Sequence, residues 1–187
     1  MHRDIDRVLL SHEQIARRVA ELARQITEDH SPPRLDGRAG VTIVPVLTGA
    51  MIFCGDLIRQ IPIAMQIGLM TVSSYPGRSV SAQGAQVVAR QLGDVRGRHV
   101  LLLDDILDSG QTIRLVKSVL QEQGAVSVKT CVLLRKDRSG IRDIAVDYVG
   151  FDIPDEFVVG YGLDFDNYYR NLPDIVTLKS KVIEGRA

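Results

Sequence analysis

The stretch VLLLDDILDSGQT, residues 100–112, decides how this sequence is interpreted. Four apolar residues run directly into two acids, and a third acid then precedes a small, donor-rich Ser-Gly turn. An apolar run of this length is typical of a buried strand, so we expect a strand over 99–103. Asp104 and Asp105 would then lie at its carboxyl end, and the turn would lead into a helix over 109–123.

The turn after this strand has the composition of an anion site. In an open parallel sheet, ligands bind beyond the carboxyl ends of the strands. Backbone N–H groups, the positive end of the following helix and the hydroxyls of Ser109 and Thr112 would converge there, which favours a phosphate. Two carboxylates beside a phosphate would repel it unless they bind hydroxyls or a divalent metal. The stretch therefore predicts a ligand with a phosphate, sugar hydroxyls and Mg2+.

The rest of the chain predicts an α/β fold. Hydrophobic periodicity and Gly or Pro breaks indicate helices over 11–29 and 50–60, and strands over 41–47, 67–72 and 126–134. Strands that alternate with helices predict a mainly parallel central sheet flanked by helices on both faces. After Arg135 the pattern becomes short and irregular, which predicts a small hood or cap, or a sheet edge.

We expect a single domain over residues 1–187. Its core would span about 35–135, and the N-terminal segment with about 136–187 would form the hood. The polar segment 73–86 holds two glycines and a proline, and it predicts a long loop of the kind that is usually functional or mobile.

Charge and composition exclude several classes of function. The 23 basic residues equal the 23 acidic ones, so no overall charge recruits nucleic acid or a membrane. The start lacks a secretory signal, and no apolar run approaches the roughly 20 residues of a membrane-spanning helix. Cys54 and Cys131 lie in separate apolar segments, which predicts reduced thiols in a cytoplasmic protein. The four histidines show no zinc-ligand spacing.

Several motifs together resemble one family. The pattern hhhhDDhhDSGxT (h, apolar) of residues 100–112 resembles the phosphoribosyl-pyrophosphate (PRPP) motif of type I phosphoribosyltransferases. GFDIPDEF followed by VVGYGLDFDNYYRNLPDI resembles the C-terminal signature of hypoxanthine(-guanine) phosphoribosyltransferases, and VLTGAMIFCGDL, SSYPGRS and LLRKDRS match further landmarks in order. The resemblance covers most of the chain from about residue 41. It implies purine salvage by Mg2+-dependent transfer of phosphoribosyl from PRPP to hypoxanthine and also guanine, giving IMP or GMP and pyrophosphate.

The resemblance assigns the sugar and phosphate contacts first. Asp104 and Asp105 match the acid pair that contacts the ribose hydroxyls, directly or through Mg2+. Asp108 matches the carboxylate near purine N7, as general base or hydrogen-bond acceptor. The loop that grips the 5′-phosphate corresponds to Asp108, Ser109, Gly110, Gln111 and Thr112. Family members often carry Lys where Gln111 stands, so this chain loses a charge there.

The purine contacts follow from the later motifs. Lys136 matches the lysine that donates to the purine 6-oxo group, which favours 6-oxopurines over adenine because an ammonium needs an acceptor. Phe157 matches the aromatic ring that stacks on the base, and Val158 would offer backbone groups to the base edge. Asp164 matches a carboxylate beside a second Mg2+ and the base.

A third set of residues is assigned to pyrophosphate: Leu47, Thr48, Gly49, Ser74, Tyr75 and Arg170. Family members often carry Lys where Thr48 stands, and the peptide before it can be cis. Ser74 and Tyr75 match a Ser-Tyr pair on a lid that closes over the reacting centre and excludes water. Arg170 presents a guanidinium suited to paired phosphate oxygens.

Two other functions fit parts of the sequence. A regulatory module of this fold would bind PRPP or a nucleotide without catalysis, and the missing lysines at positions 48 and 111 favour it. A phosphotransfer receiver also places acids at strand ends, but it does not explain the Ser-Gly-Gln-Thr turn or the C-terminal signature. The sequence leaves open the rank of hypoxanthine, guanine and xanthine, the number of Mg2+ ions, and the choice between a homodimer and a homotetramer.

Overall fold

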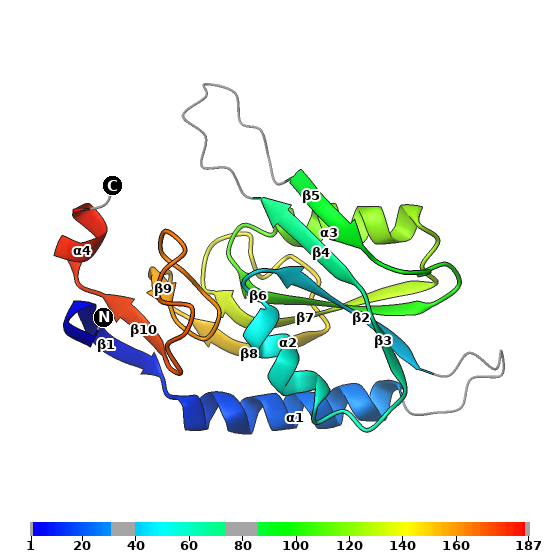
Figure 1. Cartoon of the computed structure of the whole chain (residues 1–187), viewed down its shortest axis with the longest axis horizontal. Coiled ribbons are helices and arrows are strands. Elements are labelled where there is room, and N and C mark those ends of the chain that lie inside the picture. The colour runs from blue at the N-terminus through cyan, green and yellow to red at the C-terminus, as the bar shows by residue number, and fades with distance from the viewer. Residues whose placement is uncertain (1, 31–39, 74–85, 186–187) are drawn as a thin grey trace.

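The computed structural model describes residues 2–30, 40–73 and 86–185, and its centre is an open, mainly parallel sheet (Figure 1). The strands run in the order β5-β4-β2-β6-β7-β8, with β3 beside the first half of β2. Each pairing is parallel except β4 with β5. Their bounds are β2 Val41–Leu47, β3 Met65–Ile67, β4 Leu69–Ser73, β5 Gln86–Gln91, β6 His99–Leu107, β7 Ser127–Lys136 and β8 Tyr148–Ile153. The expected fold class is confirmed.

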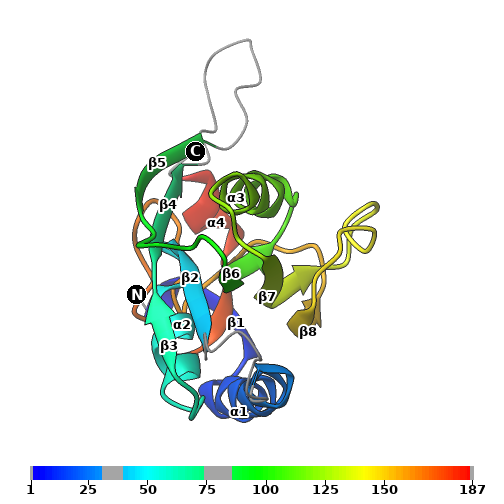
Figure 2. The ribbon, with the colours of Figure 1, turned by 90° about the vertical axis from the view of Figure 1, so that its right-hand side faces the viewer.

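Helices cover both faces of this sheet. Figure 2 shows α3 (Gln111–Glu122) on one side of the strands and α1 (His12–His30) on the other, with α2 (Met51–Ile58) on the side of α1. Alternate residues of β6 supply both cores, since side chains along a strand point to opposite faces. Leu101 and Leu103 pack toward α1 and α2, while Val100 and Leu102 pack toward α3.

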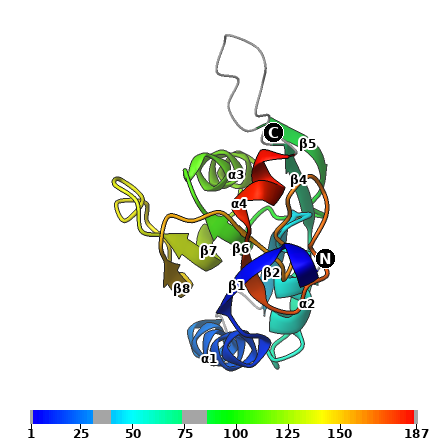
Figure 3. The same ribbon diagram turned by 90° about the vertical axis from the view of Figure 1, so that its left-hand side faces the viewer.

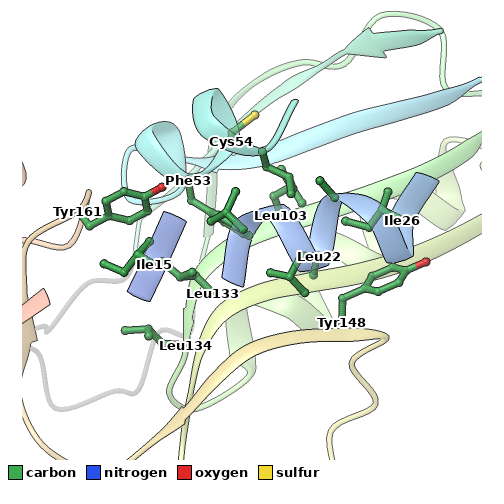
Figure 4. Close-up of a cluster of buried hydrophobic side chains, with 14 of the residues drawn as sticks. Ile15, Leu22, Ile26, Phe53, Cys54, Leu103, Leu133, Leu134, Tyr148 and Tyr161 are labelled. Atoms are coloured by element: carbon green, nitrogen blue, oxygen red, sulfur yellow. The ribbon is translucent and has the colours of Figure 1, made fainter. Parts of the chain in front are cut away.

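The start of α1 follows from its sequence. The backbone N–H of Ser11 donates to Oε1 of Gln14 at 2.9 Å, and the N–H of Gln14 points back at the Ser11 hydroxyl at 3.4 Å. This capping box satisfies two N–H groups that a helix end leaves without partners. The apolar face then includes Ile15, Leu22 and Ile26, which are fully buried against the sheet (Figure 4).

A second, smaller sheet lies at one end of the molecule (Figure 3). It is antiparallel, in the order β1-β10-β9, so the first strand of the chain pairs with the last. It is flanked by short helical turns at the two chain ends. The bounds are η1 His2–Asp4, β1 Ile5–Leu10, β9 Val158–Val159, β10 Ile175–Leu178 and α4 Ser180–Glu184. The irregular region after Arg135 therefore supplies both an edge strand of the main sheet, β8, and part of this second sheet.

The structure corrects two predicted strands. The strand expected over 99–103 continues to Leu107, because β7 is long enough to pair with it as far as Arg135. The strand expected over 67–72 is divided at Gly68 into β3 and β4. A Cβ on Gly68 would stand 2.9 Å from the carbonyl oxygen of Leu92, so a residue with a side chain does not fit here unless the backbone shifts.

Strands β1 and β5 were not anticipated. The loop expected over 73–86 falls mostly on residues 74–85, outside the described part of the chain. Cys54 and Cys131 are free and buried, and burial raises the pKa of the Cys54 thiol to about 11. In the described ranges, no helix is long and apolar enough to cross a membrane.

Candidate active site

A cleft of about 740 Å³ opens at the carboxyl ends of β2 and β6. Ligands of open parallel sheets bind at this position. Four segments line it: the end of β2 with the loop after it, Val72 of β4, the end of β6 with its turn into α3, and part of the chain between β9 and β10. The residues expected at the site that line this cleft are Leu47, Thr48, Gly49, Asp104, Asp105, Asp108, Ser109, Gly110, Thr112, Asp164 and Arg170.

The acid pair lies in the floor of the cleft. Asp104 is only 5% exposed, and its carboxylate accepts the backbone N–H of Asp105 at 3.1 Å. The carboxylate of Asp105 accepts the N–H of Ile106 at 2.9 Å. Burial raises the pKa of Asp104 well above the ordinary carboxyl range, and the neighbouring Asp105 charge adds to the effect. Burial raises the pKa of Asp105 as well. The pair is therefore suited to a cation or to hydroxyl donors.

The turn from β6 into α3 has the geometry of an anion site. Gly110 is the N-cap of α3 with φ of 73° and has no side chain to cap the helix, while the N–H of Gln111 donates to the Ser109 hydroxyl at 3.4 Å. A Cβ on Gly110 would stand 2.0 Å from Cδ1 of Ile144, so glycine fits both the backbone angle and the space. The N–H groups that follow Gln111 in the first turn of α3 are available to a bound anion, beside the cleft-lining residues Ser109 and Thr112.

The loop after β2 packs directly on the acid pair. The peptide between Leu47 and Thr48 is cis. A Cβ on Gly49 would stand 1.9 Å from Oδ2 of Asp105. A Cβ on Gly162 would in turn stand 2.1 Å from the carbonyl oxygen of Gly49. Two glycines therefore let three chain segments meet at the carboxylate of Asp105.

The segment after Gly160 holds the arginine expected at pyrophosphate. Arg170 donates to the carbonyl oxygen of Gly162 at 2.7 Å and forms an ion pair with Asp164 at 2.8 Å. The backbone N–H of Asn167 donates to the other oxygen of Asp164 at 2.8 Å. Asp164 therefore organises this loop and orients the guanidinium that lines the cleft.

Two cleft residues in this loop were missed from the sequence. Asp166 and Asn167 line the cleft, and both have positive φ, at 52° and 63°. Asp and Asn are the side chains that tolerate the left-handed region best. The adjacent Asp166 and Asn167 indicate a turn of this kind in the sequence, but they do not indicate that the turn lies at the cleft.

The lysine expected at the purine lies beside the cleft in a network of charges. Lys136, at the end of β7, is 12% exposed, and its Nζ lies 3.4 Å from Oδ1 of Asp108 and 3.3 Å from Oδ1 of Asp155. Arg138 contacts the same two carboxylates, at 2.7 Å and 3.1 Å. The hydrogen bond to Asp108 raises the pKa of the Arg138 guanidinium. Sequence reasoning identified Lys136 and Asp108, but not Arg138 or Asp155.

The other expected residues that the structure describes do not line the cleft. Phe157 is 44% exposed and meets Phe165 edge to face, with ring centroids 5.4 Å apart. Val158 is buried in β9 and pairs with Thr177. Gln111 is exposed in the first turn of α3 and does not line the cleft. Ser74 and Tyr75, expected on a lid, lie outside the described residues.

The carboxylates suit a metal that arrives with a phosphorylated ligand. Within residues 2–30, 40–73 and 86–185, no three His, Cys, Asp or Glu side chains gather closely enough to hold a metal ion by themselves. Mg2+ is usually bound through one or two carboxylates together with substrate phosphates. Asp104 and Asp105 offer such a pair, and Asp164 lines the same cleft.

An acid pair beside a helix-terminal anion site, at the carboxyl end of a parallel sheet, defines an α/β protein that binds a sugar phosphate. Residues 8–166 match the model of the phosphoribosyl transferase domain. The hypoxanthine-guanine phosphoribosyltransferase of Mycobacterium bovis is 42% identical over 97% of this chain and 90% of its own length. The Streptococcus pneumoniae protein of the same name is 38% identical, over 97% and 98%.

Solved structures agree with these relatives. A hypoxanthine phosphoribosyltransferase from Staphylococcus aureus superposes with a TM-score of 0.86 at 38% identity, over 97% of this chain and 96% of that one. A lysine-to-arginine mutant of the Trypanosoma cruzi enzyme, in complex with its product IMP, also gives 0.86, at 33% identity over 97% and 95%. The chain therefore belongs to the phosphoribosyl transferase family, and its resemblance to the hypoxanthine(-guanine) enzymes of that family is confirmed.

Proposed function

We propose that this enzyme transfers the 5-phosphoribosyl group of PRPP to hypoxanthine, and also to guanine, with Mg2+, giving IMP or GMP and pyrophosphate. One observation carries the proposal: the acid pair, the turn into α3 and the Lys136–Asp108 contact all lie around one site. Relatives that match this chain over almost its whole length carry the same activity in their names.

The sugar-phosphate half of PRPP would occupy the floor of the cleft. Asp104 and Asp105 would accept hydrogen bonds from the ribose 2′ and 3′ hydroxyls, directly or through Mg2+. The 5′-phosphate would accept from the N–H groups and hydroxyls of the turn, with contributions from Ser109, Gly110, Gln111 and Thr112. Donors fixed before the ligand arrives need no reorganisation during the reaction, which is why such a turn favours catalysis.

The purine would lie at the Asp108 end of the cleft. Lys136 would donate to the 6-oxo group, and Asp108 would accept at N7 or take the proton that the base loses. Phe157 would stack on the ring, which its exposed face permits, and Val158 would offer backbone groups to the base edge. Held in this way, a ring nitrogen attacks C1 as the bond from C1 to pyrophosphate breaks through an oxocarbenium-like centre.

Pyrophosphate would leave toward the loop after β2. Backbone groups of Leu47, Thr48 and Gly49 and the guanidinium of Arg170 would hold its oxygens. When bound, Mg2+ would neutralise charge on the leaving group, with Asp104, Asp105 and Asp164 as its carboxylate partners. Ser74 and Tyr75 would close the site as a lid, because water at C1 would hydrolyse PRPP.

Four wider expectations belong to the same proposal. The chain would form a core of about 35–135 and a hood from the N-terminal segment and about 136–187. We propose a cytoplasmic homodimer or homotetramer that binds no nucleic acid. The two buried free thiols suit a reducing compartment, and the balanced charge gives nucleic acid little to attract.

The test measures both products of the proposed reaction in the same sample. The protein is incubated with PRPP, Mg2+ and hypoxanthine, and IMP and pyrophosphate are measured together. We expect one pyrophosphate for each IMP, and no IMP when hypoxanthine is left out. If PRPP binds but neither product forms, the proposal is wrong, and a non-catalytic regulatory module becomes the better interpretation.

A further inference from the structure

Four charged side chains form a closed ring beside the cleft. Lys136 and Arg138 each contact both Asp108 and Asp155, at distances from 2.7 to 3.4 Å. Lys136 Nζ and Arg138 Nη1 share a single oxygen of Asp108. Each cation is thus shared between two carboxylates, and the ring as a whole is neutral.

The fold brings these residues together by strand pairing. Lys136 is the last residue of β7 and pairs with Ile153 at the end of β8. The N–H of Asp137 donates to the carbonyl oxygen of Ile153 at 2.8 Å, which holds the two strand ends together. Asp155 follows two residues later and so arrives beside Lys136.

The members of the ring differ in their access to water and to the cleft. The Lys136 side chain is 12% exposed, whereas those of Asp108, Arg138 and Asp155 are 45–46% exposed. Asp108 lines the cleft, while Lys136, Arg138 and Asp155 lie outside its lining. Asp108 therefore faces the cleft, whereas Asp155 contacts Lys136 without lining the cleft.

A conflict follows if both Lys136 and Asp108 must contact the purine. A carboxylate that accepts from the base at N7 has less capacity for the ammonium, and an ammonium drawn to that carboxylate is turned from the 6-oxo group. A second carboxylate that does not face the ligand removes the conflict, because it keeps the charge of the lysine paired. Asp155 is placed to do this, and Arg138 balances the two acids from the solvent side.

We propose that Asp155 is the positioning residue of the purine subsite, which holds Lys136 toward the 6-oxo group while Asp108 engages the base. The inference rests on the proposed function and adds a residue that acts through Lys136 rather than on the substrate. Without Asp155, Lys136 would pair with Asp108, and both purine contacts would weaken together. The sugar-phosphate contacts do not involve Lys136 or Asp155, so they would not change.

Steady-state kinetics of Asp155→Asn test the proposal, with hypoxanthine and PRPP varied separately. We expect KM for hypoxanthine to rise about tenfold, while KM for PRPP stays within about twofold and kcat within about threefold. The ratio of hypoxanthine to adenine turnover should fall as well. Asp155→Glu, which keeps the charge, should restore most of the hypoxanthine affinity.

Asp152→Asn is the matched control. Asp152 lies three residues earlier, is 48% exposed and pairs with Arg135 at 2.6 Å, so it loses the same charge from a similar ion pair away from Lys136. Both of its KM values should stay within about twofold of the wild type. Melting temperatures of all variants show whether each is folded, and Asp155→Ser, with the same expected rise in KM for hypoxanthine, carries the test if Asp155→Asn is not.

Each outcome bears on one claim. Equal KM values for hypoxanthine in Asp155→Asn and Asp152→Asn would overturn the role of Asp155. So would a parallel rise of both KM values in Asp155→Asn, because that indicates a general loss of structure. If the wild-type protein makes no nucleotide from hypoxanthine, the proposed function fails first, and this inference fails with it.

Discussion

At the proposed sugar-phosphate end of the cleft, Asp104 is buried and the adjacent Asp105 is partly buried. Both accept hydrogen bonds from backbone N–H groups of their own strand. At the purine end, Asp108 is nearly half exposed and shares two cations with a second acid. Burial raises the pKa of both members of the first pair, and for Asp104 the repulsion from Asp105 adds to it. The second set is neutral as a whole.

The difference between the two ends shows that the acid pair, and not the set around Asp108, needs a cation or hydroxyl donors that arrive with the ligand. Among the described residues, no cation forms an ion pair with either member of the buried pair, so a metal or a row of hydroxyl donors would stabilise it. The purine end balances its charges before the base arrives, and a neutral base exchanges hydrogen bonds there without adding charge. One cleft can thus bind a highly charged sugar phosphate and a neutral ring.

The largest effect is expected where the loop after β2 touches the buried pair. In Gly49→Ala the new methyl group would stand 1.9 Å from Oδ2 of Asp105, so the loop or the carboxylate must move. We expect kcat/KM to fall by about 10²-fold or more, because small misplacements at a reacting centre are costly. Steady-state rates measure it.

Gly55→Ala is the control for that substitution. Gly55 lies within α2, and a Cβ there would have no heavy atom of the described residues within 4 Å. Activity should be unchanged, and the helix should gain roughly 0.5–1 kcal/mol in stability. Equal rates for the two alanine variants would mean that the loop does not position Asp105.

The next effect concerns the purine end. Lys136→Met removes the proposed donor to the 6-oxo group and leaves Asp108 paired with Arg138. We expect kcat/KM for hypoxanthine to fall by about 10²-fold, as is typical when a charged hydrogen bond is lost. Lys117→Met, at a partly exposed lysine on α3 that donates to the carbonyl oxygen of Ala145, should retain full activity. A loss confined to PRPP affinity would contradict the assignment.

The next prediction concerns the acid pair, where one substitution should abolish activity and raise stability. Because the folded-state pKa of Asp104 is raised, its ionisation destabilises the fold as the pH rises above the unfolded-state pKa of about 3.9. Asp104→Asn keeps an oxygen for the Asp105 N–H and removes that charge. At pH 7 without divalent metal, we expect it to be inactive yet more stable by about 1–3 kcal/mol.

Denaturant unfolding between pH 4 and 8 measures this difference. The gain should shrink to roughly 0.5 kcal/mol near pH 4, where the folded-state carboxyl is neutral and about half of the unfolded-state carboxyls are protonated. Asp143→Asn, at an exposed acid, should differ from the wild type by less than about 0.5 kcal/mol at every pH. A variant that is less stable than the wild type at pH 7 would count against the raised pKa.

The smallest effect tests the two positions where the family often carries lysine. Thr48 lines the cleft, whereas Gln111 is exposed outside it. Thr48→Lys should therefore lower KM for PRPP about threefold, and Gln111→Lys by less than about twofold, since exposed charges contribute little. The opposite order would mean that the side chain at position 111, and not only its backbone N–H, contacts the 5′-phosphate.

The sequence predicts most of the main sheet because its signals are local. Strands β2, β6 and β7 are continuous apolar runs, and the Ser11–Gln14 capping box predicts where α1 begins. Strands β1 and β5 lie at sheet edges and are mostly exposed, so they lack the apolar pattern of a buried strand. Each of these strands forms by pairing with another strand, β1 with β10 and β5 with β4, and not from a sequence signal of its own.

Prediction of the candidate site from the sequence is limited in the same way, because only local motifs can be recognised. The acid pair, the turn and Lys136 were found because each lies in a short motif with its own chemistry. Arg138 and Asp155 look like ordinary surface charges in the sequence, and only the pairing of β7 with β8 shows that they share partners. Contacts across strands are therefore what the sequence alone could not predict.

The most direct test of the account is a competition between two bases. Equimolar hypoxanthine and adenine are supplied with PRPP and Mg2+, and the nucleotides formed are separated and counted. We predict IMP without AMP, since Lys136 offers a donor that only the 6-oxo base can accept. Formation of AMP at a comparable rate would contradict the role of Lys136, and with it the difference between the two ends of the cleft.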